Sequence, residues 1–120
     1  MYDQYLFAAN RSDALIKKIW TFIQSDPFYK NNTTLIITTD HGRGRGYRGD
    51  KFNWRSHGRL AFGSGEVWVM AIGPDVPAYG EVTTTDETSL SQIASTIAVA
   101  LGLEYSNNRV VAAPIESFSK

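Results

Sequence analysis

The run of residues 33–39, Thr-Thr-Leu-Ile-Ile-Thr-Thr, constrains the fold of this 120-residue chain more than any other segment. It is β-branched almost throughout, which favours a strand over a helix. Its apolar centre does not alternate with polar residues, a pattern typical of a strand buried on both faces in a parallel sheet. We therefore expect a central β-strand here.

An amphipathic helix is predicted before this strand, over residues 2–25. Asp26-Pro27 predicts its end, because the residue before a proline disfavours the α region. Helix, short loop and buried strand in this order indicate an α/β architecture. The helix prediction rests on apolar residues at spacings of three and four, namely Leu6, Ala9, Leu15, Ile16, Ile19, Trp20 and Ile23.

A second strand and a second helix follow. Residues 66–72 read as a strand that Gly73-Pro74 ends. Residues 83–86 predict an N-cap region for a helix that continues to about Leu101, with Gly102 as its C-cap. The apolar face of that helix is expected to comprise Leu90, Ile93, Ala94, Ile97 and Leu101.

Composition excludes several classes of function. Twelve basic residues balance twelve acidic ones, so the overall charge does not indicate a nucleic-acid or membrane partner. The absence of cysteine rules out a disulfide framework, a thiolate metal site and a cysteine nucleophile. No signal peptide opens the chain, and no apolar run approaches the roughly 20 residues that span a bilayer. The cellular compartment stays open.

Residues 42–65 form a locally basic, glycine-rich segment inside this balanced chain. They hold seven of the ten glycines, with Asp50 as the only acid among them. A connection of this length within a compact domain is usually functional or disordered. We interpret it as an active-site loop. Its basic residues are Arg43, Arg45, Arg48, Lys51, Arg55 and Arg59.

The sequence Asp40-His41-Gly42 lies directly after the predicted central strand. In open α/β sheets, ligands bind beyond the carboxyl ends of the strands. A carboxylate and an imidazole at that position can both reach a cation, and Gly42 lets the backbone turn away at once. The only other histidine, His57, also precedes a glycine and lies at the far side of the basic segment. We therefore predict a metal site that includes Asp40, His41 and His57. The prediction rests on the order of features along the chain: strand, Asp-His-Gly, basic loop, His-Gly, strand and Gly-Pro.

This order of motifs resembles the C-terminal part of the alkaline phosphatase superfamily, which includes sulfatases, nucleotide pyrophosphatase/phosphodiesterases and cofactor-independent phosphoglycerate mutases. The matching stretches are residues 35–42, 57–58, 67–74 and 92–102, and the opening helix is similar as well. The resemblance spans roughly residues 2–104. It implies a three-layer α/β/α fold with a mostly parallel sheet, of which residues 1–120 would be the C-terminal portion.

The resemblance also implies roles for individual residues. Asp40 and His41 would bind one of two metal ions, and His57 would bind the second. A mixed Asp/His set favours zinc or manganese. The two ions would clamp a phosphate or sulfate ester during hydrolysis or transfer. The basic loop fits such an anionic substrate, with Arg43, Arg45 and Arg59 as the expected contacts.

The chain departs from the family pattern in one region. The family's nucleophile and its Asp-x-x-x-His pair would precede the Asp-His-Gly strand, yet Phe7 stands where the histidine after Asp3 would be. We therefore interpret the chain as a C-terminal fragment that supplies part of the site. Alone, it is expected to bind metal weakly, to be inactive and to associate with itself through unpaired strand edges.

Three alternatives remain. The Arg/Gly segment at 43–49 is similar to segments that bind RNA, so the chain could be a non-catalytic module for nucleic acid or another anionic partner. A Ser-His-Asp hydrolase is disfavoured, because Phe-Gly-Ser64-Gly-Glu is not a Gly-x-Ser-x-Gly elbow. The third alternative is a domain of the same superfamily that has lost catalysis.

Overall fold

The computed structural model of the chain describes residues 2–45, 53–83 and 87–118. Its contacts divide the chain into two units, residues 1–35 with 72–74 and residues 36–71 with 75–120. Part of the predicted active-site loop, residues 46–52 with Arg48 and Lys51, lies outside the described residues.

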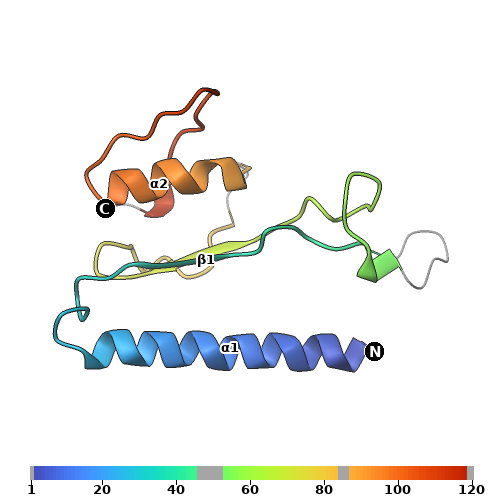
Figure 1. The fold of residues 1–120 in the computed structure, drawn as a ribbon, viewed down its shortest axis with the longest axis horizontal. Helices are drawn as coiled ribbons and strands as arrows, with labels where there is room; N and C mark the ends of the chain where they lie inside the picture. The colour runs from blue at the N-terminus through green and yellow to red at the C-terminus, as the bar shows by residue number, and fades with distance from the viewer. Residues whose placement is uncertain (1, 46–52, 84–86, 119–120) are drawn as a thin grey trace. The chain divides into compact units, whose positions relative to one another are not determined.

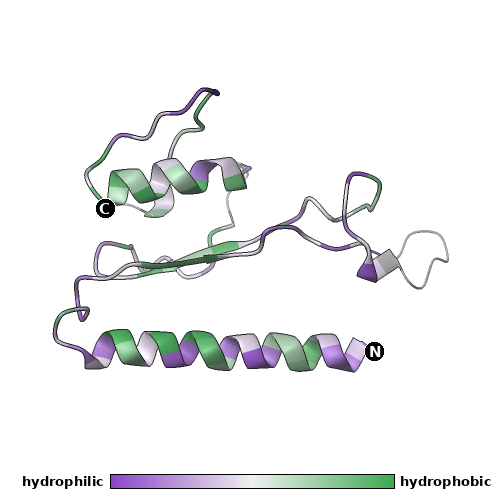
Figure 2. Ribbon diagram, in the orientation of Figure 1, coloured by the Kyte–Doolittle hydropathy of each residue, from purple (hydrophilic) through white to green (hydrophobic). Residues whose placement is uncertain are grey.

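Helix α1, Tyr2–Ser25, confirms the first predicted helix within the first unit. Hydrophobic and hydrophilic residues alternate along it with the helical repeat (Figure 2). The Asp26 side chain accepts a hydrogen bond from the Phe28 backbone N–H at 2.8 Å, which turns the chain away after the helix. Ile23 is buried, whereas Phe7, Phe22 and most other large apolar residues of α1 are exposed.

Strands β1, Leu35–Thr38, and β2, Val69–Ile72, form a two-stranded sheet (Figure 1). The two strands are antiparallel, because Gly73 lies against Thr34 while the Thr38 hydroxyl donates to the Trp68 carbonyl at 2.8 Å. The side chains of β1 are half-buried or exposed. Within the described residues, β1 is therefore not buried on both faces, contrary to the prediction. The mostly parallel sheet requires further strands and stays a prediction.

The antiparallel pairing continues past β1 into the segment that follows Asp40. The Gly42 N–H donates to the Ser64 carbonyl at 2.8 Å, and the Arg45 N–H donates to the Phe62 carbonyl at 2.9 Å. The Gly44 N–H instead donates to the Ser56 carbonyl at 2.9 Å, just after the short 3₁₀ helix η1, Asn53–Arg55. Residues 42–45 therefore hydrogen-bond to two different segments of the second unit.

The second helical region consists of the 3₁₀ helix η2, Leu90–Gln92, and helix α2, Ile93–Ala100. It begins later than predicted: residues 84–86 lie outside the described part, and the N-cap is Ser89, whose N–H donates to the Gln92 side chain at 2.8 Å. The C-cap is Leu101, one residue before the prediction, and Gly102 follows it as the glycine that ends the helix. Gly102 has a φ of 68°, and the Leu103 N–H donates to the Ala98 carbonyl at 2.8 Å, as in a Schellman motif.

The predicted apolar face of α2 is partly wrong. Ser95, Thr96 and Ala98 are the buried residues of α2, while Ile97 and Leu101 are exposed. The cause is a set of hydrogen bonds to the C-terminal segment. The Thr96 hydroxyl accepts the Ile115 N–H at 2.9 Å and donates to the Gln92 carbonyl at 2.6 Å. The Ser95 hydroxyl and the Gln92 side chain donate to the carbonyls of residues 112 and 113.

The described residues bury few side chains. The buried apolar set is Ile23, Ala98 and Ile115, and the last two belong to the packing of α2 against the C-terminal segment and the 3₁₀ helix η3, Glu116–Phe118. Among the described helices, none combines the length and the apolar character that crossing a membrane requires.

Candidate metal and anion site

Asp40 and His41 lie two and three residues beyond the end of β1. The Asp40 carboxylate accepts the His41 backbone N–H at 3.0 Å, and its other oxygen lies 3.6 Å from Nε2 of the His41 ring. Nδ1 of the same ring lies 2.6 Å from the Gly42 carbonyl oxygen. A carbonyl only accepts, so Nδ1 donates this hydrogen bond, and Nε2 is the ring nitrogen that faces the carboxylate.

His57 joins this pair through its ring. The imidazoles of His41 and His57 stack with their centroids 4.1 Å apart and 18° between their planes. The hydrogen bond from Gly44 to Ser56 holds the two backbones together next to the rings. The structure thus brings together the three residues that the sequence predicted as metal ligands.

The donor set can be tested against what a divalent ion requires. Two ligands about 2.1 Å from a tetrahedral ion are about 3.4 Å apart, close to the 3.6 Å between the Asp40 oxygen and the His41 nitrogen. Ligating histidines commonly donate their other ring N–H to a carbonyl, as His41 does to Gly42. These two residues fit a metal. Among the described residues, however, no group of three or more histidine or acidic side chains is arranged to hold one ion.

The three predicted substrate-binding arginines differ in their surroundings. Arg45 forms an ion pair with Glu66 across the antiparallel segments. Arg43 lies over the Trp54 ring, with its guanidinium carbon 5.8 Å from the ring centroid. Arg59 is exposed. Arg43 therefore contacts an aromatic side chain of the loop, whereas the charge of Arg45 is paired with that of Glu66.

Sequence reasoning placed Arg55 in the basic loop but not among the substrate contacts, and it did not include Glu66 in this region. The guanidinium carbon of Arg55 lies 5.4 Å from the centroid of the same Trp54 ring. A signal for Arg55 was present, because it precedes His57 by two residues just as Arg43 follows His41 by two. For Glu66 there was none, because its contact with Arg45 depends on the register of the antiparallel pairing.

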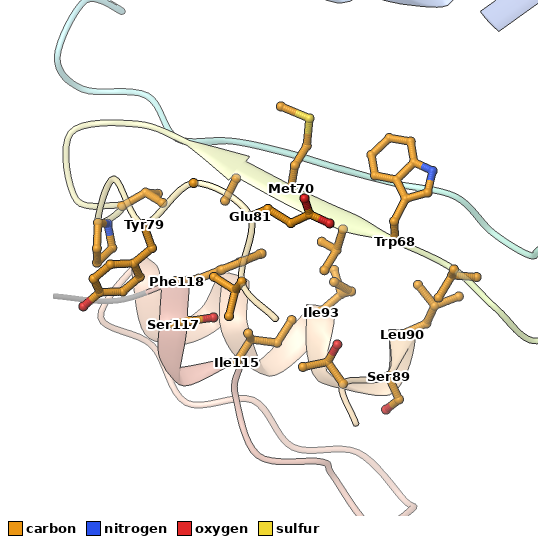
Figure 3. Close-up of a pocket in the computed structure, with 18 residues that line it drawn as sticks. Trp68, Met70, Tyr79, Glu81, Ser89, Leu90, Ile93, Ile115, Ser117 and Phe118 are labelled. Carbon is orange, nitrogen blue, oxygen red and sulfur yellow. The ribbon is translucent and has the colours of Figure 1, made fainter. Parts of the chain in front are cut away.

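A separate pocket lies in the second unit, between β2 and the α2–η3 region (Figure 3). It has a volume of about 540 Å³, and Ile93, Ile115 and Phe118 form its apolar wall. The predicted ligands Asp40 and His41 do not line it. In Figure 3 the side chains of Met70, in β2, and of Trp68, just before it, extend away from this apolar wall. The pocket lacks a histidine among its lining residues and is distinct from the candidate metal site.

No family model, curated protein or solved structure matches the chain.

Proposed function

We propose that this chain supplies part of a two-metal site for the hydrolysis or transfer of phosphate or sulfate esters, as the resemblance to the alkaline phosphatase superfamily implies. The nucleophile and the remaining ligands would come from protein outside these residues. Zinc or manganese are the expected ions, and the isolated chain is expected to be inactive.

The stacking of His41 on His57 is the observation that carries the proposal. The lone pair of an imidazole nitrogen lies in the plane of its ring. Two rings with 18° between their planes direct their lone pairs along nearly parallel planes, which suits two ions better than one.

Each residue has a defined part in this proposal. Asp40 and Nε2 of His41 would hold one ion, with the His41 ring oriented by its hydrogen bond to the Gly42 carbonyl. His57 would hold the other ion. Two divalent ions, when bound, would neutralise the developing charge on the transferring group and on the leaving oxygen. Arg43 adds a fixed positive charge beside the ester.

Calorimetric titration of the full chain with zinc and manganese tests the proposal. We expect weak binding of up to two ions per chain. Asp40→Asn and His41→Ala should each remove one binding event, because both residues belong to the same half-site. His57→Ala should remove the other. Asp75→Asn is the matched control, since Asp75 is an exposed carboxylate of the same unit that is distant in sequence from the site.

The proposal fails if wild type binds neither metal at millimolar concentration. It also fails if Asp75→Asn weakens binding as much as Asp40→Asn does, because that result would indicate non-specific attraction to carboxylates. Loss of all binding in both histidine variants would indicate one shared ion and would contradict the two-ion arrangement.

A further inference from the structure

The residues that line the pocket between β2 and the α2–η3 region all belong to the second unit. Its volume of about 540 Å³ is within the range of roughly 300–1,000 Å³ that small-molecule sites occupy. The apolar wall of Ile93, Ile115 and Phe118 is formed by α2, the C-terminal segment and η3. Ile115 is buried, so this wall belongs to the packed interior of the unit. A ligand in the pocket would therefore pack against a formed apolar surface.

Glu81 is the charged residue among the described residues that line this pocket. Its carboxylate forms no ion pair and no hydrogen bond within the described part of the chain. Figure 3 shows Glu81 around the same space as Ile93 and Phe118. A ligand that contacts the apolar wall can therefore also reach a negative charge that no cationic side chain neutralises.

The surrounding sequence is negative as well. Between Leu60 and Asn108 the chain has six acidic residues and no lysine, arginine or histidine. Most of the residues that line the pocket belong to this stretch, which follows the basic segment at 42–59. A concave site that combines one sign of charge with apolar walls raises the local concentration of ligands of the opposite charge. The pocket therefore favours a cation over an anion.

Two aromatic residues complete the lining. Tyr79 and Phe118 both line the pocket, and in Figure 3 they lie at one end of it, with Leu90 at the other. The face of an aromatic ring attracts an ammonium group that lies within roughly 6 Å of its centre. The lining thus combines a carboxylate, aromatic rings and an aliphatic wall, the three kinds of group that an organic cation with an apolar body can contact at once.

We propose that this pocket binds an organic ammonium ion that carries an apolar chain or ring. The ammonium group would lie at the Glu81 carboxylate, and the apolar part would pack on Ile93 and Phe118. Asp40 and His41 do not line the pocket, so this site is separate from the candidate metal site and needs no metal.

Calorimetry of the full chain with three probes that share one octyl chain tests the site: n-octylammonium, n-octanol and nonanoate. The buffer contains a chelator, so that metal ions play no part. We expect n-octylammonium to bind about tenfold more tightly than n-octanol, because a hydrogen bond to a charged group contributes more than one between a charged and a poorly matched neutral group. Nonanoate should bind most weakly, since Glu81 repels its carboxylate.

Variants locate the two halves of the site. Glu81→Gln should bring the affinity for n-octylammonium to within about twofold of that for n-octanol. Glu104→Gln is the matched control, because Glu104 is an exposed glutamate of the same unit that does not line the pocket. Ile93→Ala should weaken all three probes by about threefold or more, since they share the apolar contact. Ile93→Leu keeps the apolar volume and should retain the affinity. Circular dichroism checks that each variant retains its fold.

Several results would overturn the proposal. They include no binding of n-octylammonium at millimolar concentration and equal affinities for n-octylammonium and nonanoate. An equal loss in Glu104→Gln would show that only net charge matters. Unchanged affinity in Ile93→Ala would place the probe outside this pocket. If sedimentation shows a dimer, and the probe binds only at dilutions that dissociate it, a second copy of the chain and not a small cation covers the pocket.

Discussion

The imidazole rings of His41 and His57 stack 4.1 Å apart, on segments that the hydrogen bond from Gly44 to Ser56 holds together. Each ring belongs to a His-Gly pair, and Gly42 hydrogen-bonds to Ser64 on the opposite side of its segment. The contact between the histidines therefore depends on close backbone packing around Gly42 as well as on the rings themselves.

Gly42→Ala tests this dependence. A methyl group at residue 42 would overlap the backbone carbonyl oxygens of Gly63 and Glu66, which cannot shift without breaking the antiparallel pairing. We expect a loss of about 1–3 kcal/mol in the free energy of unfolding, measured with urea. Gly65→Ala is the matched control, because an added methyl there meets no atom within 4 Å. Equal effects of the two substitutions would contradict the packing described for Gly42.

Thr96→Val tests the attachment of the C-terminal segment to α2. The substitution keeps the shape of the side chain and removes the hydroxyl that accepts the Ile115 N–H at 2.9 Å. Thr96 is 5% exposed, so that N–H would lose its partner in a place with little access to water. The expected cost is about 1–3 kcal/mol of unfolding free energy. Thr83→Val, at an exposed threonine, should change stability by less than about 0.5 kcal/mol.

Ile115→Ala tests the small core beneath α2. Ile115 is 4% exposed and forms part of the apolar wall of the pocket in Figure 3. Truncating a buried isoleucine to alanine typically costs about 2–5 kcal/mol, and the open pocket beside it places the expected value at the low end. Val110→Ala, at a fully exposed valine, serves as the control. A loss below about 1 kcal/mol for Ile115→Ala would show that this core contributes little.

The ion pair between Arg45 and Glu66 is expected to contribute little to stability. The two side chains are 62% and 52% exposed, so water and salt screen their attraction. A double-mutant cycle with Arg45→Gln and Glu66→Gln should give a coupling energy below about 1 kcal/mol that falls further in 1 M salt. A larger coupling that is insensitive to salt would contradict this assignment.

The sequence predicted those features that depend on local pattern. Helix α1 follows from one long periodic run ended by Asp26-Pro27, and the position of β1 follows from its β-branched residues. The Schellman motif at Gly102 follows from a glycine at the end of an apolar helix.

Features that depend on contacts between distant residues were not predictable in this way. The buried face of α2 differs from its apolar stripe because Ser95 and Thr96 bond to the segment around residue 115. Within the candidate site, adjacency in sequence indicated Asp40 and His41 as partners. The contacts of Arg55 with Trp54 and of Arg45 with Glu66 depend instead on how the segments pair.

Electron paramagnetic resonance of the chain loaded with two equivalents of manganese tests the central claim most directly. If His41 and His57 serve two ions about 4 Å apart, the two ions couple magnetically, and the spectrum differs from the six-line pattern of isolated manganese. His57→Ala should return the spectrum to that of a single bound ion. An uncoupled six-line spectrum from wild type with both equivalents bound would contradict the two-metal arrangement.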